Sequence, residues 1–111
     1  MNAAPPAAAA LSELVAAVGE AQVSTDPAAR ELHSRDIFFW DDAPIAAAVL
    51  RPVSSQEVAA VLRIAGQHGL AVAPRGGGVS YTRGYVPAQA GTLVLDLSRM
   101  NQVHELNVED L

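Results

Sequence analysis

Apolar positions along the first third of the chain follow a helical period and then break into short steps. A helix is predicted where four apolar side chains recur at helical spacing: Leu11, Leu14, Val15 and Val18. Gly19 is typical of a helix end. Val23 then indicates a short extended step, and the capped turn over residues 24–27 predicts a brief helix over residues 27–34, with Pro27 at its first position.

The middle of the chain alternates between short apolar runs and one amphipathic stretch. Residues 47–50 form an apolar run that predicts a strand, and Ser55 with Glu57 opens a helix that residues 66–69 close. A second strand is predicted over residues 70–73. Its connection to the first is too long for a hairpin, which favours parallel strands with a right-handed crossover. The sequence therefore predicts an α/β fold with a small, partly parallel sheet flanked by helices.

Residues 92–97 predict a third strand, and residues 102–111 resemble the start of a fourth. No turn or cap follows Leu111, so we expect the chain to be the N-terminal part of a longer reading frame. Residues 1–9 are expected to be a disordered Ala/Pro tail, which leaves one domain over residues 10–111. The N-terminus lacks the features of a secretory signal and no apolar run could span a bilayer, so a cytoplasmic location is the default.

The composition argues against one class of partner and excludes the sites that need cysteine. A formal net charge of −5, with no lysine, argues against a nucleic-acid partner, because phosphate contacts need clustered basic side chains. The absence of cysteine excludes disulfides, thiolate metal sites and thiol nucleophiles.

The candidate binding element is the glycine-rich stretch APRGGGVSYTRGYVP, residues 73–87, which leaves the end of the second predicted strand. Successive glycines allow backbone N–H groups to converge on an anion such as phosphate. A Walker loop is excluded because the chain has no lysine, and the glycine spacing does not fit a Rossmann fingerprint. Two interpretations remain open: a phosphate loop, or a glycine-rich surface turn in which Arg75 and Arg83 are solvated.

Other candidate residues have plainer interpretations. His33, His68 and His104 lie far apart, so structural or solvent-facing roles are favoured over catalysis or metal binding. We expect solvated charges at Asp41 and Asp42, and a structural role for Asp96, with Arg99 or a backbone cap in the SRMN turn as its partner.

Aromatic residues gather in two places. Phe38, Phe39 and Trp40 either anchor a long loop to the core or line a ligand pocket. Tyr81 and Tyr85 either pack over the base of the glycine-rich stretch or stack near a ligand.

Three stretches together resemble the FAD-binding domain of the vanillyl-alcohol oxidase and p-cresol methylhydroxylase type, particularly the FAD-linked oxidases and dehydrogenases of 2-hydroxy acids such as glycolate and D-lactate. They are VLRPVSSQEVAAVLRIAGQHGLAVAPRGGG at residues 49–78, GYVP at residues 84–87 and LVLDLSRMNQV at residues 93–103. The resemblance extends from Val23 to the end of the chain. It implies that the chain is the first subdomain of a two-subdomain FAD-binding domain.

The resemblance also implies a cofactor, FAD, and a site for its diphosphate. The implied cofactor-binding residues are Pro74, Arg75, Gly76, Gly77, Gly78, Val79, Ser80, Thr82 and Gly84. Pro74 is expected to end the preceding strand, and Gly84 to permit the bend at the exit of the loop. Some members of the family attach the flavin through a histidine after the last glycine of the run. Val79 stands there, so non-covalent binding at this loop is expected.

The implied function is FAD binding within a flavin-dependent oxidoreductase that acts on a small organic substrate such as a 2-hydroxy acid or alcohol. The family's second subdomain and substrate domain would follow Leu111, so no catalytic residue is assigned here. The alternative is a stand-alone, non-catalytic nucleotide-binding or interaction module whose sheet edge pairs with a second polypeptide.

Overall fold

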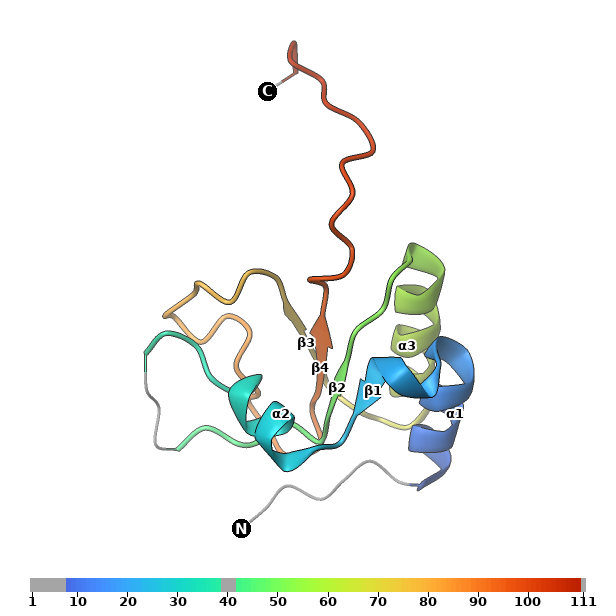
Figure 1. Cartoon of the computed structure of the whole chain (residues 1–111). Helices are drawn as coiled ribbons and strands as arrows, with labels where there is room; N and C mark the ends of the chain where they lie inside the picture. The colour runs from blue at the N-terminus through green and yellow to red at the C-terminus, as the bar shows by residue number, and fades with distance from the viewer. Residues whose placement is uncertain (1–7, 39–41, 111) are drawn as a thin grey trace.

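A computed structural model describes residues 8–38 and 42–110. Its centre is a four-stranded sheet in the order β1-β2-β4-β3 (Figure 1). The strands are β1 (Val23–Ser24), β2 (Ala48–Leu50), β3 (Val72–Arg75) and β4 (Leu93–Asp96). Strands β2 and β3 both run parallel to β4, which lies between them, while β1 pairs antiparallel with β2. The predicted partly parallel α/β fold is confirmed.

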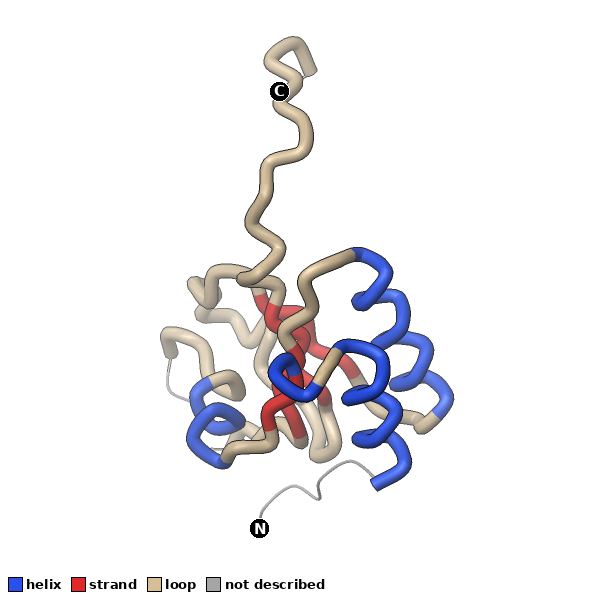
Figure 2. Tube along the Cα trace, turned by 45° about the vertical axis from the view of Figure 1, so that its right-hand side comes forward, coloured by secondary structure: helices blue, strands red, loops and turns tan. Residues whose placement is uncertain are grey.

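Helix α1 (Ala8–Val18) and helix α3 (Ser55–Gln67) pack against each other on one face of this sheet (Figures 1 and 2). Between them and the sheet lies the main core, whose buried members are Leu14, Val18, Ala48, Leu50, Val61, Ile64, Ala65, Leu93 and Leu95. Burying such side chains is worth roughly 25 cal/mol for each Å² of apolar surface. Helix α1 begins at Ala8, inside the predicted tail, and residues 1–7 lie outside the described residues.

The second face of the sheet carries a smaller apolar cluster formed by Ala46, Val49 and Val94. Because side chains alternate along a strand, Val49 and Val94 point away from α1 and α3. Helix α2 (Pro27–Leu32) lies on this side, together with the loops that join α2 to β2 and β3 to β4 (Figure 2). Both faces of the central strands are therefore covered, and β2 and β4 are buried along their whole length.

Local capping explains where the helices begin. The Asp26 side chain accepts a hydrogen bond from the Ala29 N–H at 2.9 Å, and Pro27 occupies the first position of α2, as predicted. Helix α3 is capped by Ser54, whose hydroxyl accepts from the Glu57 N–H at 3.2 Å. The helix itself begins at Ser55, as predicted.

The prediction of a further strand over residues 102–111 is wrong for the described part of the chain. Residues 101–110 contain no strand, are exposed, and project away from the body of the molecule in Figure 1. Val103 and Leu106, which suggested the strand, are 81% and 79% exposed. A strand needs a neighbour to satisfy its backbone groups, and no described segment pairs with this one.

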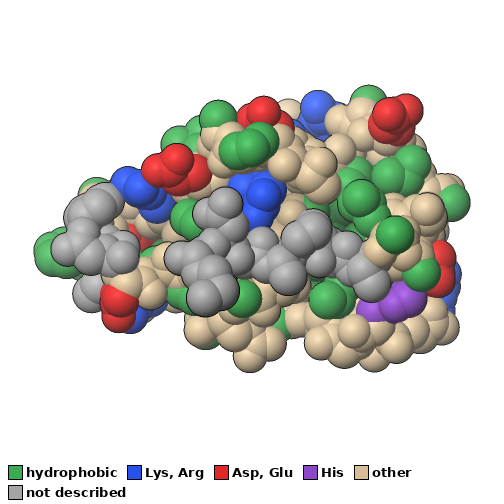
Figure 3. All heavy atoms as spheres, turned by 90° about the horizontal axis from the view of Figure 1, so that it is seen from below, with side chains coloured by type: hydrophobic (Ala, Val, Ile, Leu, Met, Phe, Trp, Pro, Cys, Tyr) green, Lys and Arg blue, Asp and Glu red, His purple; other side chains and the backbone are tan. Residues whose placement is uncertain are grey.

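The surface mixes charge types. Figure 3 shows one face, on which acidic and basic side chains are scattered among hydrophobic ones. None of the helices over residues 8–38 and 42–110 is long and apolar enough to cross a membrane.

Candidate functional site

The glycine-rich loop, residues 76–84, leaves the sheet directly after β3. Strands β2, β3 and β4 are mutually parallel, so the segments that follow them emerge at the same edge of the sheet. Ligands of open α/β sheets bind at this carboxyl edge. The loop therefore lies where the topology favours a binding site.

Pro74 lies within β3, opposite Leu95, and the strand continues through Arg75. The expectation that Pro74 ends the strand is therefore wrong. Proline lacks a backbone N–H and is tolerated in edge strands, and β3 is one of the two edge strands of this sheet.

Backbone donors are concentrated in the first half of the loop. Within the described residues, no group accepts a hydrogen bond from the backbone N–H of any of residues 76–80. Gly76 and Gly77 are exposed, and a side chain at Gly76 would meet nothing within 4 Å. The N–H groups of this run are available to an anion without interference from side chains.

Arg75 brings a positive charge to the base of the loop. Its Nη1 donates to the Arg35 carbonyl at 2.7 Å, and its guanidinium carbon lies 4.7 Å from the centre of the Tyr85 ring. A Cβ atom at Gly78 would lie 2.8 Å from Arg75 Nη2. Gly78 has a φ of +74°, a left-handed conformation that favours glycine, and a side chain at position 78 would also displace the end of the Arg75 side chain.

The second half of the loop is held by hydrogen bonds around Ser80. The Ser80 and Thr82 hydroxyls lie 3.2 Å apart, and Tyr85 Oη donates to the Ser80 carbonyl at 3.1 Å. Near the exit of the loop, Arg83 adopts a left-handed conformation with a φ of +63°. Tyr85 is buried and packs at the base of the loop, whereas Tyr81 is exposed.

Asp96, the last residue of β4, is buried and accepts three hydrogen bonds. Its Oδ2 lies 3.2 Å from His33 Nε2 and 3.3 Å from Arg51 Nε, and its Oδ1 accepts from the Ser98 N–H at 3.0 Å. Burial alone raises the pKa of Asp96, but the hydrogen bonds from Ser98 and the nearby His33 ring outweigh it, and the pKa lies below its ordinary value. The predicted backbone cap is present, while the charged partner is Arg51 rather than Arg99.

The other predicted candidates do not converge on one site. His68 pairs with Glu13 at 3.1 Å and joins the end of α3 to α1. Asp42 forms an ion pair with Arg83. Phe38 is 57% exposed, so it does not anchor its loop to the core, whereas Phe39, Trp40 and Asp41 lie outside the described residues.

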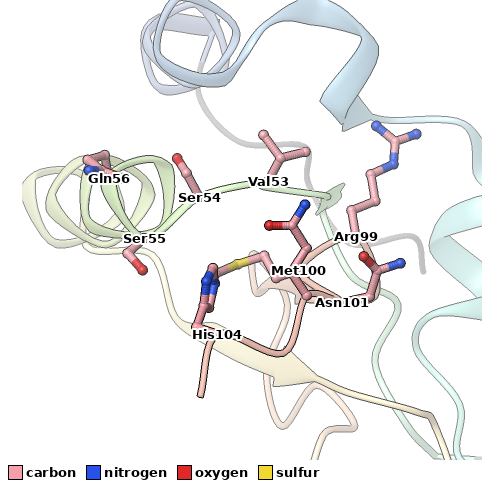
Figure 4. Close-up of a pocket in the computed structure, with 9 residues that line it drawn as sticks. Val53, Ser54, Ser55, Gln56, Arg99, Met100, Asn101 and His104 are labelled. Carbon is pink, nitrogen blue, oxygen red and sulfur yellow. The ribbon is translucent and has the colours of Figure 1, made fainter. Parts of the chain in front are cut away.

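A hollow of about 500 Å³ lies at the same edge of the sheet, between the start of α3 and the segment after β4 (Figure 4). Most of the residues that line it have polar side chains, among them Ser55, Asn101 and His104. Figure 4 shows Arg99 extending away from the start of α3. None of the residues of the glycine-rich loop lines this hollow.

Sequence reasoning missed one residue beside the loop. Asp36 accepts a hydrogen bond from the Arg83 N–H at 3.0 Å, although the two residues lie 47 positions apart. The only local signal was an aspartate whose carboxylate can accept a hydrogen bond from the N–H two residues later, a pattern typical of turns.

Comparison with known proteins identifies related chains. A family model described as FAD binding domain matches residues 46–111. The chain is 39% identical over 95 residues to D-2-hydroxyglutarate dehydrogenase of Xanthomonas citri pv. viticola, covering 85% of this chain and 20% of that protein. It is 36% identical over 101 residues to 1'-carboxy-chondrochloren decarboxylase of Chondromyces crocatus, covering 90% and 18%. The chain thus spans about a fifth of the length of these curated relatives.

Solved structures share the fold. The 4-ethylphenol oxidase of Gulosibacter chungangensis superposes with a TM-score of 0.77 at 28% identity, over 98% of this chain and 22% of that one. Substrate-bound p-cresol methylhydroxylase superposes with a TM-score of 0.75 at 20% identity, over 89% and 20%. The resemblance inferred from the sequence is confirmed.

Proposed function

We propose, for a chain that belongs to the FAD binding domain family, that the glycine-rich loop holds the diphosphate of FAD. The observation that carries the proposal is the run of backbone N–H groups at residues 76–80, none of which has an acceptor among the described residues. A diphosphate offers several acceptor oxygens to such a run. The residues present therefore fit the group that the family implies.

The remaining loop residues have subsidiary roles in this proposal. Arg75 supplies a positive charge, and Ser80 and Thr82 offer hydroxyl groups, one of which donates to the other while leaving further hydrogen-bonding capacity. Pro74 and Gly84 flank the loop and set its path. Gly78 adopts the left-handed turn that allows the backbone to curve back toward Arg75.

Binding at this loop is proposed to be non-covalent. Val79 follows the last glycine of the run, is 71% exposed, and has no nucleophilic atom. Precipitating the protein from its FAD complex with acid should leave the flavin in the supernatant. Flavin that stays with the precipitate would contradict non-covalent binding.

We propose that the whole protein is a flavin-dependent oxidoreductase acting on a small organic substrate, such as a 2-hydroxy acid or alcohol. The support is the identity to D-2-hydroxyglutarate dehydrogenase and the fold shared with 4-ethylphenol oxidase. Bound FAD supplies the hydride acceptor in such reactions. These 111 residues cover about a fifth of the length of their relatives, so we assign them binding of the diphosphate and no catalytic residue.

A titration of FAD into the purified chain tests the loop assignment, with binding followed by flavin fluorescence anisotropy and folding by circular dichroism. Gly78→Asp places a carboxylate against the phosphates, and we expect it to abolish saturable binding. Gly91→Asp is the matched control, because Gly91 also has a left-handed φ, +86°, but lies outside the loop. A folded Gly78→Asp chain that binds like the wild type would overturn the assignment. Binding of ADP but not of FAD would favour the alternative nucleotide-binding module.

A further inference from the structure

The short segment of residues 35–38 lies against the glycine-rich loop at three separate points. Arg75 Nη1 donates to the Arg35 carbonyl at 2.7 Å, where the loop begins. The Ile37 N–H donates to the Ser80 carbonyl at 3.2 Å, in the middle of the loop. Near the loop's exit, the Arg83 N–H donates to Asp36 Oδ2 at 3.0 Å. The beginning, middle and end of the loop are therefore attached to three consecutive residues, 35–37.

These residues precede the region matched by the family model, which starts at residue 46. They are also separated from the sheet core, since Ile37 and Phe38 are 62% and 57% exposed. Hydrophobic burial is therefore not what holds this segment in place. The contacts that join the segment to the loop are hydrogen bonds.

Asp36 is the residue of the segment whose side chain reaches the loop. Its Oδ1 accepts from the Phe38 N–H at 2.9 Å, which fixes the local turn, while Oδ2 accepts from Arg83. Arg83 is the one non-glycine residue with positive φ among those that the structure describes. A left-handed conformation at a residue with a side chain costs roughly 1–2 kcal/mol, and the charged acceptor on its N–H offsets part of that cost.

Three arginines surround the contact between Asp36 and the loop. Arg35 precedes Asp36, Arg75 reaches the carbonyl of Arg35, and Arg83 donates its backbone N–H and pairs with Asp42. A carboxylate beside an anion site repels a diphosphate, so its charge by itself would weaken the binding of such a ligand. Its hydrogen bonds to two N–H groups are the physical reason for a carboxylate there.

We propose that Asp36 is a positioning residue that holds the glycine-rich loop in its diphosphate-binding conformation. This inference rests on the proposed function of the loop. Asp36 does not touch the ligand. It acts through the Arg83 backbone, and the contacts of Ile37 and Arg75 extend the same attachment toward the run of free N–H groups at residues 76–80.

Two substitutions at position 36 distinguish the effect of the Asp36 hydrogen bonds on the loop from the effect of its negative charge on the ligand. Asp36→Ala removes both acceptors, and Asp36→Asn removes the charge but keeps one acceptor oxygen. If Asp36 positions the loop, FAD and ADP should bind about tenfold more weakly to Asp36→Ala, the loss expected for a hydrogen bond to a charged group, and by a smaller factor to Asp36→Asn. If Asp36 acted only through charge, both variants would bind these ligands more tightly than the wild type.

The controls are a second carboxylate and a ligand without phosphate. Asp110→Asn removes a negative charge from the exposed segment after β4 and should leave the affinity unchanged. Riboflavin lacks the diphosphate, so any weak binding that it shows should not differ between wild type and Asp36→Ala. Circular dichroism establishes that each variant is folded at the temperature of the titration.

A second measurement needs no ligand. The Arg83 amide should exchange with solvent faster in Asp36→Ala than in the wild type or in Asp110→Asn, as followed by NMR. Unchanged exchange in a folded Asp36→Ala chain, or faster exchange with unaltered FAD and ADP affinity, would overturn the inference. If Asp36→Ala does not fold, Asp36→Asn decides by the same criteria. A wild type that binds neither FAD nor ADP would instead refute the proposed function, while the exchange of Arg83 would still report whether Asp36 holds the loop.

Discussion

Replacing Gly78 by alanine tests the geometry at the base of the glycine-rich loop. Two costs are expected, because the position is left-handed with a φ of +74° and because the new Cβ would lie 2.8 Å from Arg75 Nη2. The left-handed conformation costs alanine roughly 1–2 kcal/mol. Alanine also lowers the conformational entropy of the unfolded chain, which offsets about 0.4–1 kcal/mol of that cost. The net cost of conformation alone is therefore about 1 kcal/mol.

The second cost arises because the Arg75 side chain must move away from the new methyl group. It would lose its hydrogen bond to the Arg35 carbonyl, worth about 0.5–1.5 kcal/mol, and its contact with the Tyr85 ring, worth about 0.5–1 kcal/mol at an exposed site. We therefore expect Gly78→Ala to lower the free energy of unfolding by about 2–3 kcal/mol in total.

Urea denaturation followed by circular dichroism measures these costs. Gly91→Ala is the matched control, because Gly91 has a φ of +86° but a Cβ there would meet nothing within 4 Å. It should cost about 1 kcal/mol, the cost of conformation alone. In an Arg75→Ala background, Gly78→Ala should also cost only about 1 kcal/mol, since the displaced contacts are already gone. Equal losses for Gly78→Ala and Gly91→Ala in the wild-type background would refute the argument from Arg75.

Three further predictions concern the fold. The pKa of Asp96 is lower in the folded state, so its carboxylate contributes stability that is fully present above its ordinary pKa of 3.8 and is lost as the pH falls through the lower folded value. Asp96→Asn should therefore reduce the dependence of the unfolding free energy on pH in that range. Leu14→Ala should cost about 2–5 kcal/mol in urea denaturation, whereas Leu106→Ala, at a 79% exposed position, should change stability by less than about 0.5 kcal/mol. Ser54→Ala should lower the free energy of unfolding by about 1 kcal/mol through loss of the cap of α3, and Ser55→Ala, one position later, should have a much smaller effect in the same assay.

The elements predicted from the sequence are those whose signals are local. Periodicity, capping residues and glycine placed α1, α2 and α3 within a few residues, and the apolar runs placed β2, β3 and β4. The strand predicted over residues 102–111 failed because periodicity reports a suitable pattern, whereas a strand also requires a partner.

The contacts around the candidate site are mostly non-local, and the sequence could not assign them. For Asp96 the sequence offered Arg99 or a backbone cap in the SRMN turn, and the local cap from Ser98 is present. Its charged partners are distant, since Arg51 is 45 positions away and His33 is 63. The contact between Asp36 and Arg83 is of the same kind. Spacing in a sequence indicates what a loop can bind, whereas the supports of that loop depend on which distant segments the topology brings together.

The position of β4 in the sheet has a consequence for how the chain acquires its structure during synthesis. Among the strands that the structure describes, β4 is made last, yet it lies between β2 and β3 and is the hydrogen-bonding partner of both. Until it emerges, the inner edges of β2 and β3 have no native partner. At typical elongation rates, the roughly 20 residues between the ends of β3 and β4 take about 1–4 s to synthesise. A nascent chain in that interval exposes unsatisfied strand edges, the kind of surface that chaperones cover and that otherwise leads to aggregation.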